Sequence, residues 1–198
     1  NIFLNICNFN IIIDLMKYFF CFGMPKSGTS FLQMLINSHP QLSCPAEHRL
    51  NNLLNQLPNI LTKYNEDLIY VNKVTTNRDL VMLNSEDLNL WAKFIVERAL
   101  VRGANNRKVK FNGIKDNGLI KNIDFYINNF FDEKYIYLIR DPRQVGVSTW
   151  HNNIRLDKKF QNGKDIDSWT INISKNWSSD ISLIKKILKE KKLNIMIF

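Results

Sequence analysis

The fold of this chain is decided by the stretch Phe19-Phe20-Cys21-Phe22-Gly23-Met24-Pro25-Lys26-Ser27-Gly28-Thr29-Ser30-Phe31-Leu32. The apolar run from Tyr18 to Phe22 predicts a buried strand, and a short loop with two glycines follows it. Apolar residues at positions 31, 32, 35 and 36 then fall on one helical face, and His39-Pro40 predicts the end of that helix. A strand, a loop and a helix in this order direct backbone N–H groups and the positive end of a helix dipole toward an anion.

The loop itself is rich in groups that bind anions. Lys26 brings a positive charge, and hydroxyl donors come from Ser27, Thr29 and Ser30. Gly23 and Gly28 have the spacing of the nucleotide loop G-x-x-x-x-G-K-[ST], but Thr29 stands where its lysine belongs. No Lys-Ser/Thr pair follows Gly28 to hold a nucleotide-bound Mg²⁺. The loop therefore predicts a P-loop-like anion site that has departed from ATP hydrolysis, and an ordinary loop before a buried helix is the alternative.

Composition indicates one globular domain. The chain has 198 residues, of which 45% are apolar and 12% aromatic, and its net charge is +9. This charge suits an anionic ligand, and nucleic acid is the rival interpretation. However, many lysines fall at 158–159 and 185–192, where a solvated surface explains them equally well, and no nucleic-acid-binding motif is present. We therefore expect no nucleic-acid partner, and the oligomeric state is left open.

The remaining pattern predicts strands that alternate with helices. Such alternation is typical of an α/β fold, here a three-layer P-loop-like domain with a central parallel sheet flanked by helices. The stretch from about 59 to 84 is polar and rich in asparagine, and it gives no clear prediction. We expect further strands at 109–115, 135–139 and 193–198, and helices at 50–57, 85–103 (with Ser85 as N-cap), 119–130, after Pro142, and at 177–192.

Three basic residues follow predicted strands directly. Lys26, Lys115 and Arg140 each lie at the carboxyl end of a strand, the edge at which parallel sheets bind their ligands. Ser148 follows Arg140 by eight residues, inside the next predicted helix. A guanidinium and a hydroxyl in this arrangement can hold a phosphate from two directions. The sequence thus predicts one shared anion site at this edge.

These motifs resemble those of sulfotransferases that use 3′-phosphoadenosine 5′-phosphosulfate (PAPS). Pro25-Lys26-Ser27-Gly28-Thr29-Ser30 is similar to their loop for the 5′-phosphosulfate, and 137–148 is similar to their segment for the 3′-phosphate. The resemblance implies in-line transfer of the sulfuryl group from PAPS to an acceptor hydroxyl, without a metal. The donor-binding residues that it implies are Lys26, Ser27, Gly28, Thr29, Ser30, Arg140 and Ser148.

A partial resemblance to the tyrosylprotein sulfotransferase branch adds catalytic candidates. Residues 39–49 resemble the segment in which a Glu accepts the proton of the acceptor hydroxyl, which implies Glu47 as base and Arg49 as a substrate contact. His48 is the rival base, because small-molecule sulfotransferases use a His. Lys115, in Ile114-Lys115-Asp116-Asn117, resembles the Lys of an N-K-D-P segment that neutralises the transferring group, although the proline is absent. The branch also carries Arg where this loop has Lys26.

Other functions stay open from the sequence. A P-loop kinase or NTPase would need an acidic Mg²⁺ ligand, for which Asp116 or Asp141 could be proposed. A nucleotide-binding module without activity is a further alternative. The acceptor could be a protein tyrosine, a carbohydrate or a small alcohol. The three cysteines, Cys7, Cys21 and Cys44, lack metal-ligand spacing, and we expect Cys21 to be a small core residue.

The resemblance runs from about Tyr18 to Phe198. Because members of the family continue with further helices, we expect a sulfotransferase domain at 16–198 that is incomplete at its C-terminus. Residues 1–15 are expected to be an extension outside the domain, with Met16 as the native start. No signal peptide or membrane-spanning run is recognisable. We expect a cytoplasmic location, or the Golgi lumen if an upstream anchor is missing.

Overall fold

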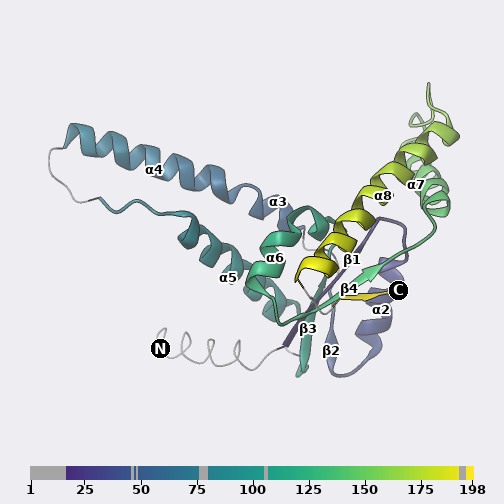
Figure 1. Cartoon of the computed structure of the whole chain (residues 1–198), viewed down its shortest axis with the longest axis horizontal. Helices are drawn as coiled ribbons and strands as arrows, with labels where there is room; N and C mark the ends of the chain where they lie inside the picture. The colour runs from purple at the N-terminus through teal and green to yellow at the C-terminus, as the bar shows by residue number, and fades with distance from the viewer. Residues whose placement is uncertain (1–16, 46, 48, 76–79, 105–106, 192–194) are drawn as a thin grey trace.

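The structure, a computed structural model, describes residues 17–45, 47, 49–75, 80–104, 107–191 and 195–198. Its parallel sheet contains β1 (Lys17–Gly23), β2 (Leu42–Ser43), β3 (Phe111–Lys115), β4 (Lys134–Leu138) and β5 (Ile195–Ile197), in the order β2-β3-β1-β4-β5. Around it lie α2 (Thr29–Ser38), α3 (Leu50–Leu54), α4 (Leu57–Val74), α5 (Ser85–Gly103), the 3₁₀ helix η1 (Asn117–Asn122), α6 (Ile123–Asn129), α7 (Pro142–Leu156) and α8 (Ile166–Lys191) (Figure 1).

The centre of the sheet is β1, which pairs with β3 on one side and β4 on the other. Its residues are buried on both faces, which explains why its sequence is a continuous apolar run. The two neighbouring strands bring Lys115 and Leu138 beside the end of β1, where the glycine-containing loop begins. The predicted α/β P-loop-like fold, with helices on both faces of a parallel sheet, is confirmed.

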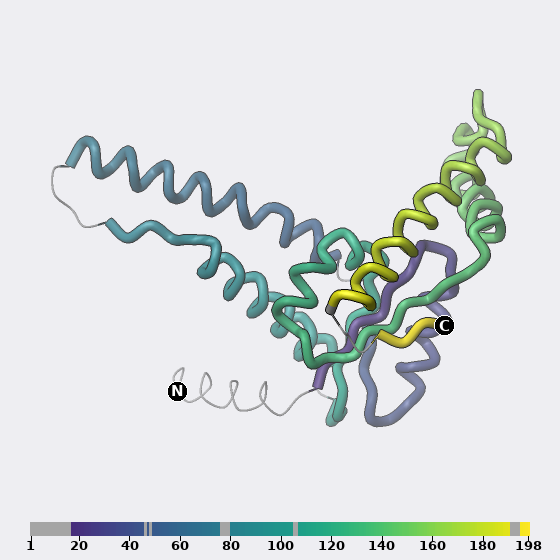
Figure 2. The backbone as a smooth tube through the Cα atoms, viewed as in Figure 1, coloured from purple at the N-terminus to yellow at the C-terminus, as the bar shows by residue number. Residues whose placement is uncertain are grey.

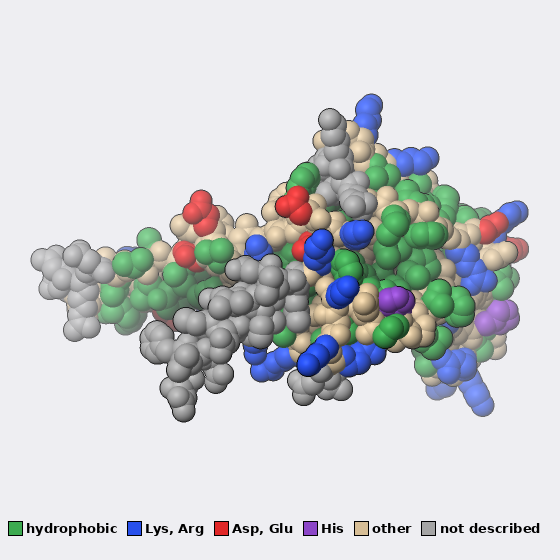
Figure 3. All heavy atoms as spheres, turned by 90° about the horizontal axis from the view of Figure 1, so that it is seen from below, with side chains coloured by type: hydrophobic (Ala, Val, Ile, Leu, Met, Phe, Trp, Pro, Cys, Tyr) green, Lys and Arg blue, Asp and Glu red, His purple; other side chains and the backbone are tan. Residues whose placement is uncertain are grey.

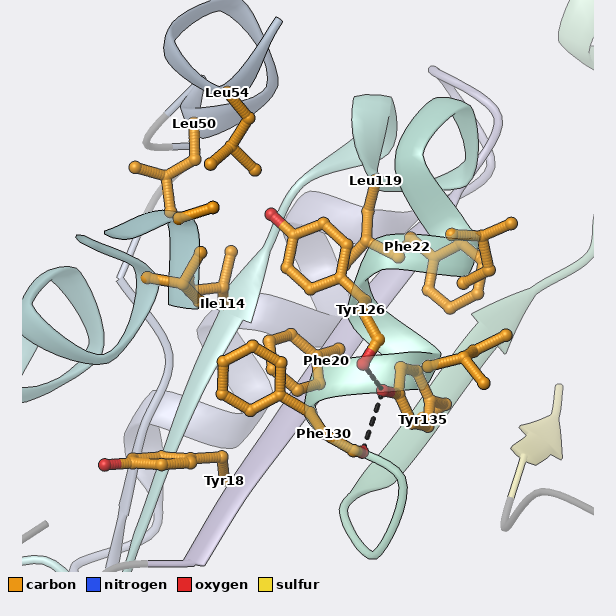
Figure 4. Close-up of a cluster of buried hydrophobic side chains, with 14 of the residues drawn as sticks. Tyr18, Phe20, Phe22, Leu50, Leu54, Ile114, Leu119, Tyr126, Phe130 and Tyr135 are labelled. Carbon is orange, nitrogen blue, oxygen red and sulfur yellow. Dashed lines mark hydrogen bonds between the residues drawn. The ribbon is translucent and has the colours of Figure 1, made fainter. Parts of the chain in front are cut away.

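The larger core lies on the face of the sheet that receives Tyr18, Phe20 and Phe22 (Figure 4). Helices α3, α5, α6 and α8 cover this face, and aromatic rings dominate the packing. The hydroxyl of Tyr135 is fully buried there and donates to two backbone carbonyls, those of Tyr126 (3.0 Å) and Phe130 (2.9 Å). A buried tyrosine hydroxyl needs such hydrogen-bond partners. These contacts therefore stabilise the turn that connects α6 to β4.

The opposite face of the sheet packs against α2. Phe19 and Cys21 of β1, Ile36 of α2 and Cys44 form its buried core. The expected role of Cys21 as a small core residue is confirmed, since its exposure is 0%. A hydrogen bond with the neighbouring Cys44 thiol raises the pKa of the Cys21 thiol, and burial in this cluster raises it further. Cys7 lies outside the described residues.

Helices α4 and α5 project away from the sheet as a pair (Figure 2). We call this pair, with the described residues between the two helices, the arm. Helix α4 was not predicted, because the sequence from 59 to 84 gave no clear pattern. Pro58, expected to end a helix, instead stands in the first turn of α4, where its missing N–H costs nothing.

Several other boundaries differ from the sequence prediction. The N-cap of α5 is Asn84 rather than Ser85: its side chain accepts from the N–H of Asp87 (3.2 Å), and the Asp87 carboxylate accepts from the N–H of Asn84 (2.9 Å). Helix α8 begins at Ile166, eleven residues before the predicted start. In α2, Phe31 and Leu35 are exposed (69% and 58%), because only one side of that helix meets the sheet. The edge strand β2, Leu42–Ser43, was not predicted from the sequence.

Candidate active site

The loop after β1 has the backbone of an anion site. Ser27 N–H donates to the carbonyl of Met24 (3.1 Å), and this turn leads directly into α2. Lys26 (φ 71°) and Gly28 (φ 98°) both adopt left-handed backbone conformations, which alternate with ordinary ones so that successive N–H groups can converge. Gly28 is the N-cap of α2, and the fully formed helix places its positive dipole end at the loop.

Gly23 allows the loop to leave the sheet close to β4. A Cβ added at this position would lie 2.6 Å from the carbonyl oxygen of Leu138, nearer than real Cβ atoms come to backbone. A larger residue would therefore push β1 and β4 apart where the site begins. Gly23 is required because there is no space for a side chain, whereas Gly28 is required because its backbone is left-handed.

Lys26 and Arg140 link this loop to the end of β4 and to α7. The guanidinium of Arg140 donates to the carbonyl oxygen of Lys26 (2.8 Å) and to Oε1 of Gln144 (3.1 Å). The ammonium of Lys26 donates to Oδ1 of Asn152 in α7 (3.2 Å). Two cations from segments more than a hundred residues apart are thus held side by side by neutral partners, so their charges stay available to an anion.

Asp141 begins α7 and orients the segment that carries Ser148. Its carboxylate accepts from the N–H of Arg143 (2.9 Å) and pairs with the Arg143 guanidinium (2.6 Å). These contacts hold the pKa of Asp141 at about 2, well below its usual range. Asp141 is therefore a helix cap, and the rest of α7 presents Ser148 to the same side as Arg140.

A carboxylate and an ammonium meet where β3 ends. Nζ of Lys115 lies 2.6 Å from Oε1 of Glu47. The Lys115 side chain is only 6% exposed, while that of Glu47 is 35% exposed. The lysine side chain is therefore held inside the protein, and the carboxylate is the partner that solvent can reach. A carboxylate held in this way can accept a proton from a group that enters the site.

Asp116, the residue after Lys115, serves the structure around η1. Its Oδ1 accepts from the N–H of Gly118 (2.8 Å) and its Oδ2 from the amide of Asn51 (3.4 Å). Asn122 joins the group by donating to Asn51 (2.8 Å). This buried network ties η1 to α3 and fixes the position of the Lys115 backbone.

All these elements border one cleft of about 370 Å³ at the carboxyl ends of the strands. Three cations, one carboxylate and several hydroxyls face a common space. The cleft is lined by Pro25, Lys26, Gly28, Thr29, Ser30, Glu47, Lys115, Asn117, Arg140 and Ser148. The cations and hydroxyls of this site can bind a ligand with two anionic groups, and its carboxylate can remove a proton from a second ligand.

The comparison with known protein families agrees with this geometry. A family model described as "Sulfotransferase family" matches residues 19–192. The chain belongs to the sulfotransferase family.

Two solved structures with a similar fold are sulfotransferases. The sulfotransferase domain from the curacin biosynthetic pathway matches with a TM-score of 0.54 and 15% identity, over 93% of this chain and 67% of that one. The sulfotransferase STF9 from Mycobacterium avium matches with a TM-score of 0.52 and 13% identity, over 93% of this chain and 59% of that one. At such identities the likeness concerns the fold. A search of curated proteins found no match.

The cleft of this sulfotransferase contains most of the residues that the sequence singled out. Lys26, Thr29, Ser30 and Gly28 line it from the loop, and Glu47, Lys115, Arg140 and Ser148 line it from the other segments. Ser27 is not a lining residue, because its side chain is buried within the loop. Arg49 does not line the cleft either: it is the exposed N-cap of α3, with φ 50°. His48 lies outside the described residues.

Two residues of the site were missed by sequence reasoning. Asn117 lines the cleft next to Lys115, and Asn152 holds the Lys26 ammonium. The position of Asn117, two residues after the end of β3, was a usable signal. Asn152 had none, since only the packing of α7 brings it to the loop.

The described residues contain no group of three or more His, Cys, Asp and Glu side chains that could hold a metal ion. Nor does any helix in the described part of the sulfotransferase have the length and apolar character needed to cross a membrane.

Proposed function

We propose that this sulfotransferase moves the sulfuryl group of PAPS to the hydroxyl of an acceptor. The observation that carries the proposal is the meeting of Lys26, Lys115, Arg140 and Ser148 with Glu47 on one cleft. The family supports a sulfotransferase as such. The choice of PAPS as donor rests on the two phosphate-binding arrangements described above.

The residues present fit a donor with a phosphosulfate at one end and a second phosphate at the other. The loop 25–30 offers backbone N–H groups, a helix N-terminus and the Lys26 ammonium. Oγ of Ser27 is buried within this loop, has no hydrogen-bond partner in the described part of the chain and does not line the cleft. Arg140 and Ser148 border the same cleft and suit the second phosphate.

In the proposed reaction Glu47 removes the proton from the acceptor hydroxyl. The acceptor oxygen forms a bond to sulfur while the bond from sulfur to the bridging phosphate oxygen breaks, and the electron pair of that bond stays on the phosphate. Lys26 and the loop N–H groups stabilise the charge that develops on this oxygen. Lys115 has two roles: it holds the Glu47 carboxylate at 2.6 Å and adds positive charge beside the transferring group.

The acceptor reaches Glu47 from the exposed side of the Glu47–Lys115 pair. A protein tyrosine, a carbohydrate and a small alcohol all offer the required hydroxyl, and we propose Asn117 as a neighbouring polar contact for any of them. The cellular location follows the acceptor. We propose the cytoplasm, and the Golgi lumen is the alternative.

The P-loop kinase alternative has less support. It requires an acidic ligand for Mg²⁺ beside the loop. Asp116 is committed to the N–H of Gly118 and to Asn51, and Asp141 is committed to Arg143 and the start of α7. Either carboxylate would have to abandon a structural role to bind a metal.

Calorimetric titration with adenosine 3′,5′-bisphosphate, run beside 5′-AMP and ATP-Mg²⁺, tests the proposal. We expect the bisphosphate to bind most tightly, and Arg140→Ala to remove this preference. Arg143→Ala is the matched control, because Arg143 is an arginine of the same segment whose partner is Asp141 and which does not line the cleft. Binding of ATP-Mg²⁺ without binding of the bisphosphate would refute the proposal.

A further inference from the structure

Two side-chain amides of α2 hold the backbone of Cys44. The amide of Asn37 accepts from the N–H of Cys44 (2.8 Å) and donates to its carbonyl oxygen (2.6 Å). Gln33 donates to the same carbonyl oxygen (3.0 Å). Because Gln33 and Asn37 are four residues apart, they share one side of the helix. We call these three hydrogen bonds the amide clamp.

The amide clamp begins where the pairing of the edge strand ends. Strand β2 is only two residues long, and its register with β3 ends at Ser43. Cys44 follows directly and is fully buried (0% exposed), so its backbone polar groups need partners inside the protein. Asn37 and Gln33 provide them, and the Cys44 side chain lies in the same buried cluster as Cys21 of β1. Cys44 is therefore fixed through both its backbone and its side chain.

Glu47 lies between two fixed points of the chain. It is three residues after Cys44 and three residues before Leu50, the first residue of α3. Three residues of chain span at most about 10–11 Å. Helix α3 is itself held by Asn51, whose amide donates to Asp116 in the buried network described above (3.4 Å). These two fixed points confine the backbone of Glu47 to a small region beside the cleft.

The helix that carries the amide clamp also begins at the donor loop. Gly28 is the N-cap of α2, and Lys26 and Thr29 line the cleft beside it. A regular helix thus connects the loop to the backbone that leads to Glu47. In-line transfer needs the acceptor oxygen, the sulfur and the leaving oxygen in one line, and a misplacement of about 1 Å can cost about 10²-fold in rate.

We propose that Asn37 is a positioning residue for sulfuryl transfer. It acts through the backbone of Cys44, and it holds the Glu47 carboxylate at a set place relative to the donor loop. Gln33 supports it. Asn37 does not line the cleft, so its effect does not come from contact with the donor or the acceptor. This inference rests on the proposed function, because it concerns the base and the donor loop assigned there.

Steady-state transfer and calorimetric binding of adenosine 3′,5′-bisphosphate, both with the full chain, separate positioning from binding. Asn37→Ala should lower kcat by about 10–100-fold. The Kd of the bisphosphate should stay within a few-fold, since every group of the donor loop is retained. Gln33→Ala removes only one of the three hydrogen bonds, so it should lower kcat less, and it provides the test if Asn37→Ala does not fold.

A double substitution shows whether Asn37 acts through Glu47. Once Glu47→Gln has removed the base, the addition of Asn37→Ala should lower the remaining rate by less than about twofold. Fully additive losses would mean that Asn37 acts by another route, and would overturn the inference. Full activity of Glu47→Gln would remove the proposed base and this inference with it. An active Asn37→Ala beside an inactive Glu47→Gln would overturn the inference alone.

Asn65 provides a matched control. Its side chain accepts from the N–H of Leu83 (3.1 Å) and donates to the carbonyl oxygen of Leu83 (2.7 Å), the same pair of contacts that Asn37 makes with Cys44. These contacts lie within the arm, which extends away from the body of the molecule (Figure 3). Asn65→Ala should therefore keep kcat within a few-fold. Tyr70→Ser, an exposed position of α4 (67%), should also leave kcat unchanged.

Thiol labelling tests the amide clamp without donor or acceptor. The buried Cys44 should react slowly with iodoacetamide in the unaltered chain. Asn37→Ala should free this segment to open, so that labelling of Cys44, located by peptide mass spectrometry, becomes about tenfold faster or more. Asn65→Ala should leave this rate unchanged. Equal labelling of Cys44 in Asn37→Ala and the unaltered chain would overturn the inference.

Discussion

Replacement of Glu47 by glutamine separates catalysis from binding and stability. Oε1 of Glu47 lies 2.6 Å from Nζ of Lys115, whose side chain is 6% exposed. Glutamine keeps the shape of the side chain and an oxygen that can accept from the lysine, but it loses the charge and cannot take up a proton. The change therefore removes the proposed base and leaves the proposed donor-binding groups in place.

The size of each effect follows from this contact. Breaking a fully buried ion pair costs about 3–5 kcal/mol, and an exposed pair contributes about 0–1 kcal/mol. Because Glu47 is about one-third exposed and glutamine still accepts a hydrogen bond, we expect Glu47→Gln to lower the free energy of unfolding by about 1–2 kcal/mol. Loss of a general base lowers the rate of transfer by about 10²–10⁴-fold.

Three measurements on the same variant check this account: urea unfolding, calorimetric binding of adenosine 3′,5′-bisphosphate, and the initial rate of sulfuryl transfer. Glu66→Gln, the same chemical change on the exposed surface of α4, is the control. We expect binding within a few-fold of the unaltered protein, with transfer almost abolished. Transfer that stays within tenfold of the unaltered rate would remove Glu47 from the role of base.

Three further predictions concern the donor loop and the core. Lys26→Ala should lower the transfer rate by about 10²–10³-fold, measured with saturating donor, whereas Lys26→Arg should retain part of it. Tyr135→Phe removes the donor of two buried carbonyls and should lower the free energy of unfolding by about 1–3 kcal/mol, measured by urea unfolding; no loss would contradict the contact. Burial raises the pKa of Glu133 above its ordinary value, although the N–H of Tyr18 opposes this. Its protonation therefore favours the folded state, so its contribution to stability is complete below the ordinary pKa and is lost as pH rises through the raised one. Glu133→Gln should abolish that part of the pH dependence of stability, and an unchanged pH profile would contradict the prediction.

The sequence was sufficient for most of the sheet and for most of the cleft. Strand β1 is buried on both faces and appears as a continuous apolar run, while β3 and β4 are shorter and partly buried. Lys115 ends β3, and Lys26 and Arg140 follow β1 and β4 within three residues, so all three lie at the carboxyl edge of a parallel sheet, where ligands bind. Local sequence thus placed Lys26, Lys115 and Arg140 together without any knowledge of tertiary contacts.

Features that depend on long-range packing could not be predicted in the same way. Helix α4 lies mostly outside the core, so its apolar positions are interrupted by polar ones and its helical period is weak. Phe31 and Leu35 fall on the same apparent apolar face as Ile36, yet only the position of the sheet decides which of them is covered. Arg49, the N-cap of α3 with a left-handed backbone conformation, does not line the cleft, and its position was not predictable from the sequence motif alone.

The most direct test of the account follows the sulfuryl group itself. PAPS labelled in its sulfuryl group is incubated with the chain and, in separate reactions, with a tyrosine peptide, a carbohydrate and a small phenolic alcohol. We predict that label passes to one class of acceptor, and that Lys26→Ala and Glu47→Gln each suppress this transfer while Tyr70→Ser does not. Transfer that persists in both cleft variants, or a chain that binds adenosine 3′,5′-bisphosphate but passes label to none of the hydroxyl acceptors, would contradict the proposed reaction.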